Sequence, residues 1–361
     1  MITPNNRQAA EPAQLPAPIS SNSGRIWAFI YNPARPRMPL EKVVALRSES
    51  GNIYELNTNR RIFQTIYGGV YEGFRLNLYN NTDPNRIVYV RSNMHLAIKV
   101  YSIANIETLG QIHEDPTQEF AALQFLGDYD GMGTGNINIL GQIELMITPE
   151  EMYSVMRRFN GSDLWAYVRE LELEEDILGE EKAKHIFKQL LHAVEYLHSF
   201  GMAHRDISLE NILYDPEDHR AVLIDFGMCI VCTENPNTDP AWNMVELTRT
   251  LFMAGKPRYL APEMNDLALL HQGFDPMLAD IWMMGVVLQA MVTGQLPIRQ
   301  AVDTDNDFQR ITSDYMDYIA TVGYDQVMSP DLQNFIQGIL RRDPAERLTL
   351  TQMRDHEWLQ H

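Results

Sequence analysis

Cysteine, positive charge and long apolar runs are all scarce in this chain of 361 residues. Two cysteines cannot build a disulfide framework, so we expect a reducing compartment, in first place the cytoplasm, with a nuclear location left open. The 29 Lys and Arg against 48 Asp and Glu leave a formal charge of −19, which argues against nucleic acid and favours basic partners. The longest apolar run, Ile281–Val292, is too short to span a bilayer, and we expect no membrane partner.

What is present is ordinary for a globular protein, with 45% hydrophobic and 21% charged residues and enough length for two lobes. Residues 1–24 differ, because four prolines lie there among Ala, Gln, Asn and Ser, with little to bury. This composition predicts a disordered, Pro-rich tail. A regulatory partner that docks on this tail remains an open alternative.

Beyond the tail, the apolar pattern changes character along the chain. Apolar residues flank Glu49–Asn52, which predicts a hairpin there. Further strand-like runs are Arg61–Ile66, Val70–Leu78, Ile87–Val90 and Leu96–Tyr101. From Asp163 onward the spacing is helical, and Glu180–Phe200 places apolar residues on one face, namely Ile186, Leu190, Val194 and Leu197. The sequence therefore predicts an α+β protein with a small strand-rich lobe and a larger helical lobe.

One short span holds three groups that phosphoryl transfer requires. The stretch His204–Asn211 reads His-Arg-Asp-Ile-Ser-Leu-Glu-Asn, and Asp225-Phe-Gly follows fourteen residues later. In this pattern Asp206 accepts the proton of an incoming hydroxyl, while Asn211 and Asp225 hold magnesium against the nucleotide phosphates. The chain thus resembles the eukaryotic protein kinase family, over roughly residues 60–359.

The resemblance implies a two-lobed kinase fold whose β-rich N-lobe carries one main helix. On this basis residues 25–55 form an N-terminal extension, residues 56–156 the N-lobe and residues 157–361 the helical C-lobe. ATP and Mg²⁺ are the implied cofactors, and a protein substrate is the implied partner.

Ala97-Ile98-Lys99 resembles the family's strand whose lysine grips the α and β phosphates. A helical Glu orients that lysine in the family, and Glu119, twenty residues on, is the best candidate, with Glu114 as the alternative. Surface positions for Lys99 and Glu119 are the plainer interpretation of two isolated charges.

The resemblance also implies the rest of the nucleotide site. Met156, at the end of a strand-like run, would be the gatekeeper, and backbone groups near Arg157 and Phe159 would bind adenine. Asp163 would bond the ribose. An ordinary interdomain loop is the alternative.

Structural motifs of the family follow. Gly255–Glu263 resembles the substrate-docking segment, and Glu263 is expected to form a buried pair with Arg347. Asp280 would bond the backbone of the catalytic loop. His204 is expected to be a buried packing residue rather than a base.

The glycine-rich loop of the family is degraded here. Aligned on Tyr67-Gly68-Gly69-Val70, Phe63 and Thr65 occupy the first two glycine positions, which weakens the grip on phosphates, although Gly68 and Val70 remain. About fourteen residues around Asn80–Pro84 are additional to the family pattern, and they predict a hairpin extension. The Gly131, Gly133 and Gly135 run follows Lys99 and suggests only a flexible turn.

A second departure is paired. Ser208 stands where the family has a catalytic-loop Lys, and Lys256 stands where it has a Thr that touches that Lys and Asp206. We therefore expect a swap in which Lys256 supplies the missing positive charge. An exposed Lys256 beside a crippled site is the alternative.

Specificity and regulation are indicated more weakly. No Arg follows Asp206 closely, as it does in tyrosine-specific relatives, so serine or threonine is the expected acceptor, and Glu210 suggests basic residues near the target. Arg205 would bind a phosphate on the activation segment, with Thr248 and Thr250 as candidate sites. Cys229 and Cys232 are best interpreted as ordinary small side chains.

The sequence therefore predicts a serine/threonine protein kinase with Lys99, Asp206 and Lys256 as catalytic residues. The alternative is a pseudokinase that acts as a nucleotide-binding scaffold or allosteric module, which the altered positions Phe63, Thr65 and Ser208 would favour.

Overall fold

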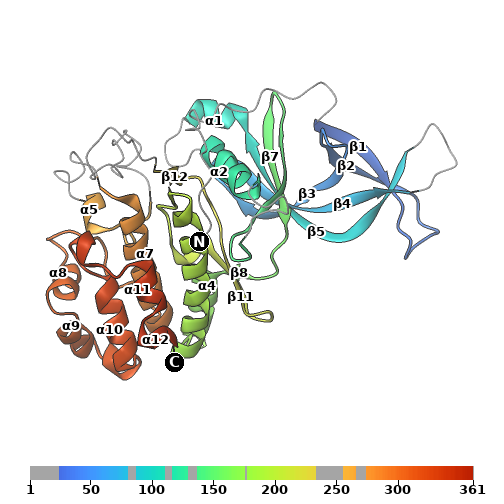
Figure 1. The fold of residues 1–361 in the computed structure, drawn as a ribbon. Coiled ribbons are helices and arrows are strands. Elements are labelled where there is room, and N and C mark those ends of the chain that lie inside the picture. Colours follow the sequence, from blue (N-terminus) through green and yellow to red (C-terminus); the bar gives the residue numbers. More distant parts are fainter. Residues whose placement is uncertain are drawn as a thin grey trace, which may run out of the picture.

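The computed structural model describes residues 24–79, 87–109, 116–128, 136–174, 177–232, 255–265 and 274–360. Over these ranges the N-terminal part is mainly a β-sheet and the C-terminal part mainly helical, and the two lie beside each other in Figure 1. The predicted α+β class with two lobes is confirmed. The predicted tail lies outside the described residues except for Gly24.

Within the described residues, the N-lobe is built on a seven-stranded sheet in the order β1-β2-β3-β4-β5-β7-β6. The strands are β1 (Gly24–Ile30), β2 (Glu41–Arg47), β3 (Ile53–Gln64), β4 (Gly68–Leu78), β5 (Val88–Ser102), β6 (Gln142–Ile147) and β7 (Glu151–Arg157). β2 and β3 form the hairpin predicted around Glu49–Asn52. β3 also crosses the predicted boundary between the extension and the N-lobe, so the extension shares the sheet.

The first strand closes part of this sheet into a ring. β1 pairs with β2 on one side and, in parallel, with the start of β5 on the other, where Phe29 lies opposite Val88. Apolar side chains fill the space inside, namely Ala28, Ile30, Val43, Ala45, Ile53, Leu76 and Tyr89. The β4–β5 ladder reaches Leu78 opposite Tyr89. The strands on either side of the predicted hairpin extension are therefore paired, while Asn80–Pro84 lie outside the described residues.

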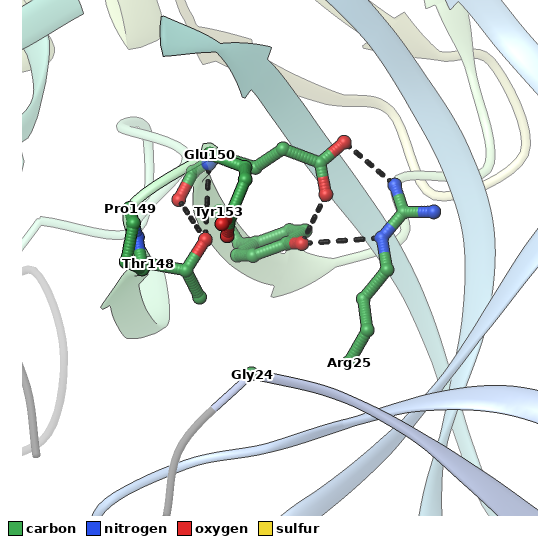
Figure 2. A pocket seen from close by; sticks show the side chains of 7 residues that line it. Gly24, Arg25, Thr148, Pro149, Glu150 and Tyr153 are labelled. Atoms are coloured by element: carbon green, nitrogen blue, oxygen red, sulfur yellow. Dashed lines mark hydrogen bonds and ion pairs between the residues drawn. The ribbon is translucent and has the colours of Figure 1, made fainter. Parts of the chain in front are cut away.

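A polar network also ties β1 to β7 (Figure 2). Arg25 donates to the Glu151 carboxylate at 2.7 Å and to the Tyr153 hydroxyl at 3.2 Å, and that hydroxyl donates to Glu151. A pocket of about 400 Å³ opens beside this network. No predicted site residue lines it, so we assign it no part in the chemistry.

In the described part of the N-lobe, the helices α1 (Ile103–Leu109) and α2 (Pro116–Asp128) accompany the sheet. Phe120 of α2 packs into a small cluster with Tyr67, Tyr101 and Met152. This cluster joins the helix to three strands or turns of the sheet, and α2 is the one main helix predicted for the N-lobe.

The C-lobe follows β7 and is mainly helical (Figure 1). Its described helices are α3 (Leu164–Leu173), α4 (Glu180–Ser199), α5 (Pro262–Asn265), α7 (Pro276–Thr293), α8 (Asn306–Ser313), α9 (Tyr315–Val322), α10 (Pro330–Ile339), α11 (Leu350–Arg354) and α12 (Glu357–Gln360). Short strands near the lobe boundary are β8 (Ser162–Asp163), β9 (Met202–Ala203), β10 (Ile212–Asp215), β11 (Arg220–Leu223) and β12 (Ile230–Val231).

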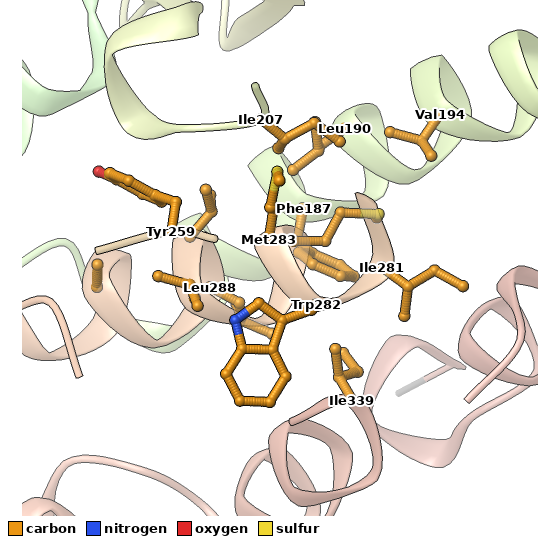
Figure 3. Packing of buried hydrophobic residues seen from close by; sticks show 14 of the residues in the cluster. Phe187, Leu190, Val194, Ile207, Tyr259, Ile281, Trp282, Met283, Leu288 and Ile339 are labelled. Carbon is orange, nitrogen blue, oxygen red and sulfur yellow. The ribbon is translucent and has the colours of Figure 1, made fainter. Parts of the chain in front are cut away.

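The C-lobe core gathers around α4 and α7. The predicted apolar face of α4 is confirmed, since Ile186, Leu190, Val194 and Leu197 are all buried. Figure 3 shows α4 side chains facing Met283 of α7 and the Trp282 ring packed near Ile339. Among the described residues, α7 is the one helix long and apolar enough to cross a membrane, but 83% of it is buried in the protein. It is therefore the core helix of this lobe.

Candidate active site

Lys99 and Glu119 form a buried ion pair between β5 and α2. The Lys99 ammonium donates to both carboxylate oxygens of Glu119, at 2.9 and 2.7 Å. The predicted contact is thus confirmed, and surface positions for the two charges are wrong, because Lys99 is 8% and Glu119 4% exposed. Burial by itself lowers the pKa of Lys99, but the Glu119 carboxylate and Asp225 outweigh it, and the pKa is raised. The lysine therefore stays charged. Glu114 lies outside the described residues.

Asp280 of α7 bonds to the backbone of the loop His204–Asn211. The Asp280 carboxylate accepts the backbone N–H of His204 at 2.8 Å and of Arg205 at 2.7 Å, as predicted. Arg205 has a positive φ of 67°, a strained conformation for a side chain other than glycine. Two bonds to one carboxylate offset that strain and fix the residue that follows, Asp206.

His204 takes the packing role expected of it. Its Nε2 lies 3.1 Å from the carbonyl oxygen of Ile224, and its ring packs edge-on against Phe226 at 5.1 Å. The side chain is fully buried, which leaves Asp206 as the candidate base of the loop.

Asp206 and Asn211 are joined directly. The Asn211 amide donates to the Asp206 carboxylate at 2.6 Å and to its carbonyl oxygen at 2.8 Å. Burial raises the pKa of Asp206, the nearby Asp225 adds to this, and Lys256 and His204 oppose it. A raised pKa makes a carboxylate a better proton acceptor, as a general base requires.

Asp225, just after β11, interacts electrostatically with Lys99 of β5. It has a positive φ of 66°, and its carboxylate accepts the Gly227 N–H at 3.3 Å. Although burial raises the pKa of Asp225, Lys99 and the Gly227 bond prevail and lower it, so the carboxylate is ionised. Asp225 and Asn211 offer carboxylate and amide oxygens, the hard ligands that magnesium prefers. This donor set fits Mg²⁺ bound partly through substrate phosphates.

Lys256 lies beside Ser208, the residue that stands where the family has its catalytic-loop lysine. Its ammonium donates to the Ser208 hydroxyl at 2.8 Å and to the Asp206 carboxylate at 3.2 Å. The alternative prediction of an exposed Lys256 is wrong. Only a third of its side chain is accessible, and its ammonium contacts Asp206 and Ser208. Nearby, the Tyr259 hydroxyl donates to Glu210 at 3.0 Å, which fixes the carboxylate expected to meet a basic substrate residue.

The segment that joins the two lobes follows β7. Met156 pairs with Ala97 across the sheet, so both side chains project from the face that also carries Lys99. Phe159 packs against the guanidinium of Arg220 at 5.9 Å, while Arg157 is exposed. Asp163 caps α3 by accepting the Ala166 N–H at 2.8 Å, so one of its oxygens is already engaged.

The degraded glycine-rich loop is a tight turn between β3 and β4. The Gln64 side chain donates to the carbonyl oxygens of Thr65 at 3.0 Å and Gly68 at 2.6 Å, so the turn binds itself. Phe63 is 67% exposed. A Cβ at Gly68 would lie 2.0 Å from the Val100 oxygen, so strand packing requires glycine there. Val70 lies directly opposite Lys99.

The predicted Glu263–Arg347 pair is confirmed. The Arg347 guanidinium donates to both Glu263 oxygens at 2.7 and 2.6 Å, and both side chains are buried. The pair links the docking segment to the end of the C-lobe.

The structure describes only some of the residues expected to act in regulation. Arg205 donates to the Met228 carbonyl oxygen at 2.6 Å, while Thr248 and Thr250 lie outside the described residues. Gly131, Gly133 and Gly135 also lie outside them.

Burial raises the pKa of both Cys229 and Cys232 to about 12, so their thiols are protonated and poorly reactive.

Two contacts of the site were not predicted from the sequence. The Tyr101 hydroxyl donates to Glu119, and His198 lies 3.0 Å from the Asp280 carboxylate. The alternation of β5 puts residue 101 on the same face as Lys99, which is a signal for the first contact. No pattern in the sequence indicates the second.

Comparison of the sequence with known proteins gives protein kinases as its relatives. A protein-kinase-domain family model matches residues 86–359. CBL-interacting protein kinase 21 of Oryza sativa subsp. japonica is 30% identical over 73% of this chain and 43% of its own length. Maternal embryonic leucine zipper kinase of Xenopus laevis is 31% identical, over 59% and 29%. SNF-related serine/threonine-protein kinase of Homo sapiens is 28% identical, over 75% and 31%. The chain spans less than half the length of each of these relatives.

Proposed function

The chain belongs to the protein kinase family, and from this we propose that it transfers the γ-phosphate of Mg-ATP to serine or threonine hydroxyls of protein substrates. The family generally uses ATP and Mg²⁺. Serine/threonine kinases among the relatives support the acceptor class.

In the proposed reaction Lys99, oriented by Glu119, binds the α and β phosphates, and Asp206 receives the proton of the acceptor hydroxyl. Backbone groups near Arg157 and Phe159, beside the Met156 gatekeeper, would bind adenine. Magnesium held by Asn211 and Asp225 would neutralise phosphate charge. The catalytic gain comes from positioning and charge stabilisation, since phosphoryl transfer needs little covalent chemistry from the protein.

The smaller contacts of the nucleotide are proposed on the same basis. Asp163 would bond the ribose through the carboxylate oxygen that does not cap α3. Ala97, Gly68 and Val70 would line the cleft from β4 and β5. Glu210, steadied by Tyr259, would favour a basic residue near the target.

The observation that carries the proposal is the position of Lys256. A kinase site without its catalytic-loop lysine lacks a cation near the developing charge, and this ammonium lies 3.2 Å from Asp206. A chain with no catalytic task has no need of this compensation. Lys256 is therefore proposed as the third catalytic residue.

The test is transfer of labelled γ-phosphate from Mg-ATP to a degenerate Ser/Thr/Tyr peptide library, with Asp206→Asn as the blank. Transfer to Ser and Thr that disappears in the blank supports the proposal. Transfer to Tyr alone would reject the acceptor class. Folded protein that binds Mg-ATP yet gives only the blank value would reject the activity.

A nucleotide-binding pseudokinase is the second candidate. The observation in its favour is the self-bonded turn with the exposed Phe63, which presents a bulky side chain where the family has glycine. Magnesium-dependent thermal stabilisation by ATP without any transfer would be the result this candidate expects.

A further inference from the structure

Tyr101 lies two positions after Lys99 on β5, so the two side chains project from the same face of the sheet. Its ring is 1% exposed and packs edge-on against Phe120 of α2, with centroids 5.6 Å apart. The Lys99 ammonium lies 5.1 Å from the centroid of the same ring. Tyr101 therefore lies between Lys99 and α2, the helix that carries Glu119.

The Tyr101 hydroxyl donates to the Oε2 atom of Glu119. Glu119 consequently receives three bonds from β5, two from Lys99 and one from Tyr101. When phosphate oxygens bind the Lys99 ammonium, they compete with Glu119 for its three N–H groups. The bond from Tyr101 does not take part in that competition.

The electrostatics make this third bond important. Lys99 and Tyr101 of β5 bond to Glu119, and Asp225 and Cys229, which follow β11 in the chain, interact with it electrostatically. Burial raises the pKa of Glu119 and Asp225 raises it further, while Lys99 and the Tyr101 bond lower it. A donor lost from this buried carboxylate makes its protonated form more favourable.

Tyr101 also connects α2 with the turn between β3 and β4. It shares a buried cluster with Tyr67, Phe120 and Met152, and the neighbouring Ser102 N–H donates to the Tyr67 carbonyl oxygen at 2.9 Å. The ring thus packs against three elements, and the hydroxyl adds a directional contact to one of them.

We propose that Tyr101 is a positioning residue that keeps Glu119, and with it α2, in the orientation that binds Lys99 when nucleotide is present. The inference rests on the proposed function for its catalytic readout. On this proposal, the ion pair between Lys99 and Glu119 forms in the chain without bound nucleotide and without a partner protein.

The test compares Tyr101→Phe with Tyr54→Phe in the full chain. Both variants keep the ring and remove one hydroxyl that donates to a glutamate in the N-lobe, but Tyr54 donates to Glu144, away from the site residues. For Tyr101→Phe we expect the KM for Mg-ATP to rise on the order of tenfold at neutral pH, because a hydrogen bond to a charged group is lost. For Tyr54→Phe we expect an unchanged KM.

The pH profile separates positioning from general loosening. Glu119 must be ionised to hold Lys99, so a raised Glu119 pKa means that activity fails at a higher pH. We expect the acid limb of kcat/KM for Mg-ATP to move up by about one pH unit in Tyr101→Phe. In a Glu119→Gln background the same change should have no further effect.

Hydrogen exchange over residues 116–128 supplies a readout that needs no activity. We expect faster exchange in Tyr101→Phe than in the wild type or in Tyr54→Phe. If the wild type transfers no phosphate, the proposed function fails, while this measurement still decides the role of Tyr101. Wild-type exchange in Tyr101→Phe, or equal effects of the two variants on exchange, would overturn the inference, as would unchanged KM and pH profile in an active enzyme.

Discussion

The Lys256 ammonium lies 3.2 Å from the Asp206 carboxylate and 2.8 Å from the Ser208 hydroxyl, although fifty residues separate Lys256 from Asp206 in the chain. A serine in the catalytic loop and a lysine in the docking segment therefore meet at one point. Each would be an unexplained departure from the family if taken alone. Their contact makes them a single substitution in which the cation comes from the other segment.

Replacing Lys256 by Met is expected to lower kcat roughly a hundredfold or more, because a group that stabilises charge in the transition state is lost. Lys188→Met, at an exposed lysine on α4, is the matched control and should retain full activity. Steady-state kinetics with saturating Mg-ATP and peptide measure both variants. Equal activity of Lys256→Met and the wild type would reject its catalytic role.

Moving the charge tests the same relationship in reverse. The double variant Ser208→Lys with Lys256→Thr returns the cation to the catalytic loop, and we expect it to recover much of the kcat that Lys256→Thr alone loses. The reason is that the reaction requires a cation near the developing charge, whichever segment supplies it. No recovery, in a folded protein, would show that Lys256 does more than supply charge.

The pH dependence of kcat should report Asp206. Burial raises the pKa of this carboxylate, and Lys256 opposes the rise. Because a general base must be unprotonated, activity falls as the pH drops below that pKa. Removing Lys256 takes away the opposing charge, so the acid limb of kcat in Lys256→Met should move to higher pH. An acid limb in the same place would mean that another group controls it.

Asp225→Asn should abolish the magnesium-dependent part of nucleotide binding. ATP with Mg²⁺ is expected to raise the Tm of the wild type by mass action, and the variant should lose the added shift that magnesium brings. Asp303→Asn, at an exposed carboxylate of the C-lobe, should behave as the wild type. The thermal shift is measured with ATP alone and with ATP plus Mg²⁺. An undiminished magnesium effect would place the metal elsewhere.

Arg347→Ala should destabilise the protein by about 3–5 kcal/mol, since it leaves the Glu263 carboxylate buried without its partner. Arg354→Ala is the control, because its pair with Glu195 lies at the surface, where Arg354 is 54% exposed, and should cost about 0–1 kcal/mol. Denaturant unfolding of both variants checks the difference. Similar costs would mean that the buried pair is not a fastening of the C-lobe.

Much of the fold follows from short-range patterns. The hairpin around Glu49–Asn52 and the buried face of α4 are both predicted correctly, because turn residues and apolar spacing act within a few residues. The contact of Lys99 with Glu119 is also predicted, because the family resemblance implies a helical Glu that orients this lysine. The nucleotide and metal roles of these site residues stay predictions until ligand binding is measured.

Other features depend on segments that meet only after folding. The pairing of β1 with β5 joins Phe29 to Val88, and nothing near either residue specifies this partner. The His198 contact with Asp280 is of the same kind. Such contacts are decided by how whole elements pack, which local spacing does not encode.

The sequence by itself determined the family, the order of the motifs and the chemical groups available for phosphoryl transfer, because these reside in short contiguous stretches. The sequence left two positions open for Lys256, and the tertiary structure decided that its ammonium reaches Asp206. The contact of the Tyr101 hydroxyl with Glu119 was decided by the tertiary structure alone. The physical reason is the range of the forces involved. A hydrogen bond acts over about 3 Å, so residues distant in the chain interact only where packing brings their atoms together.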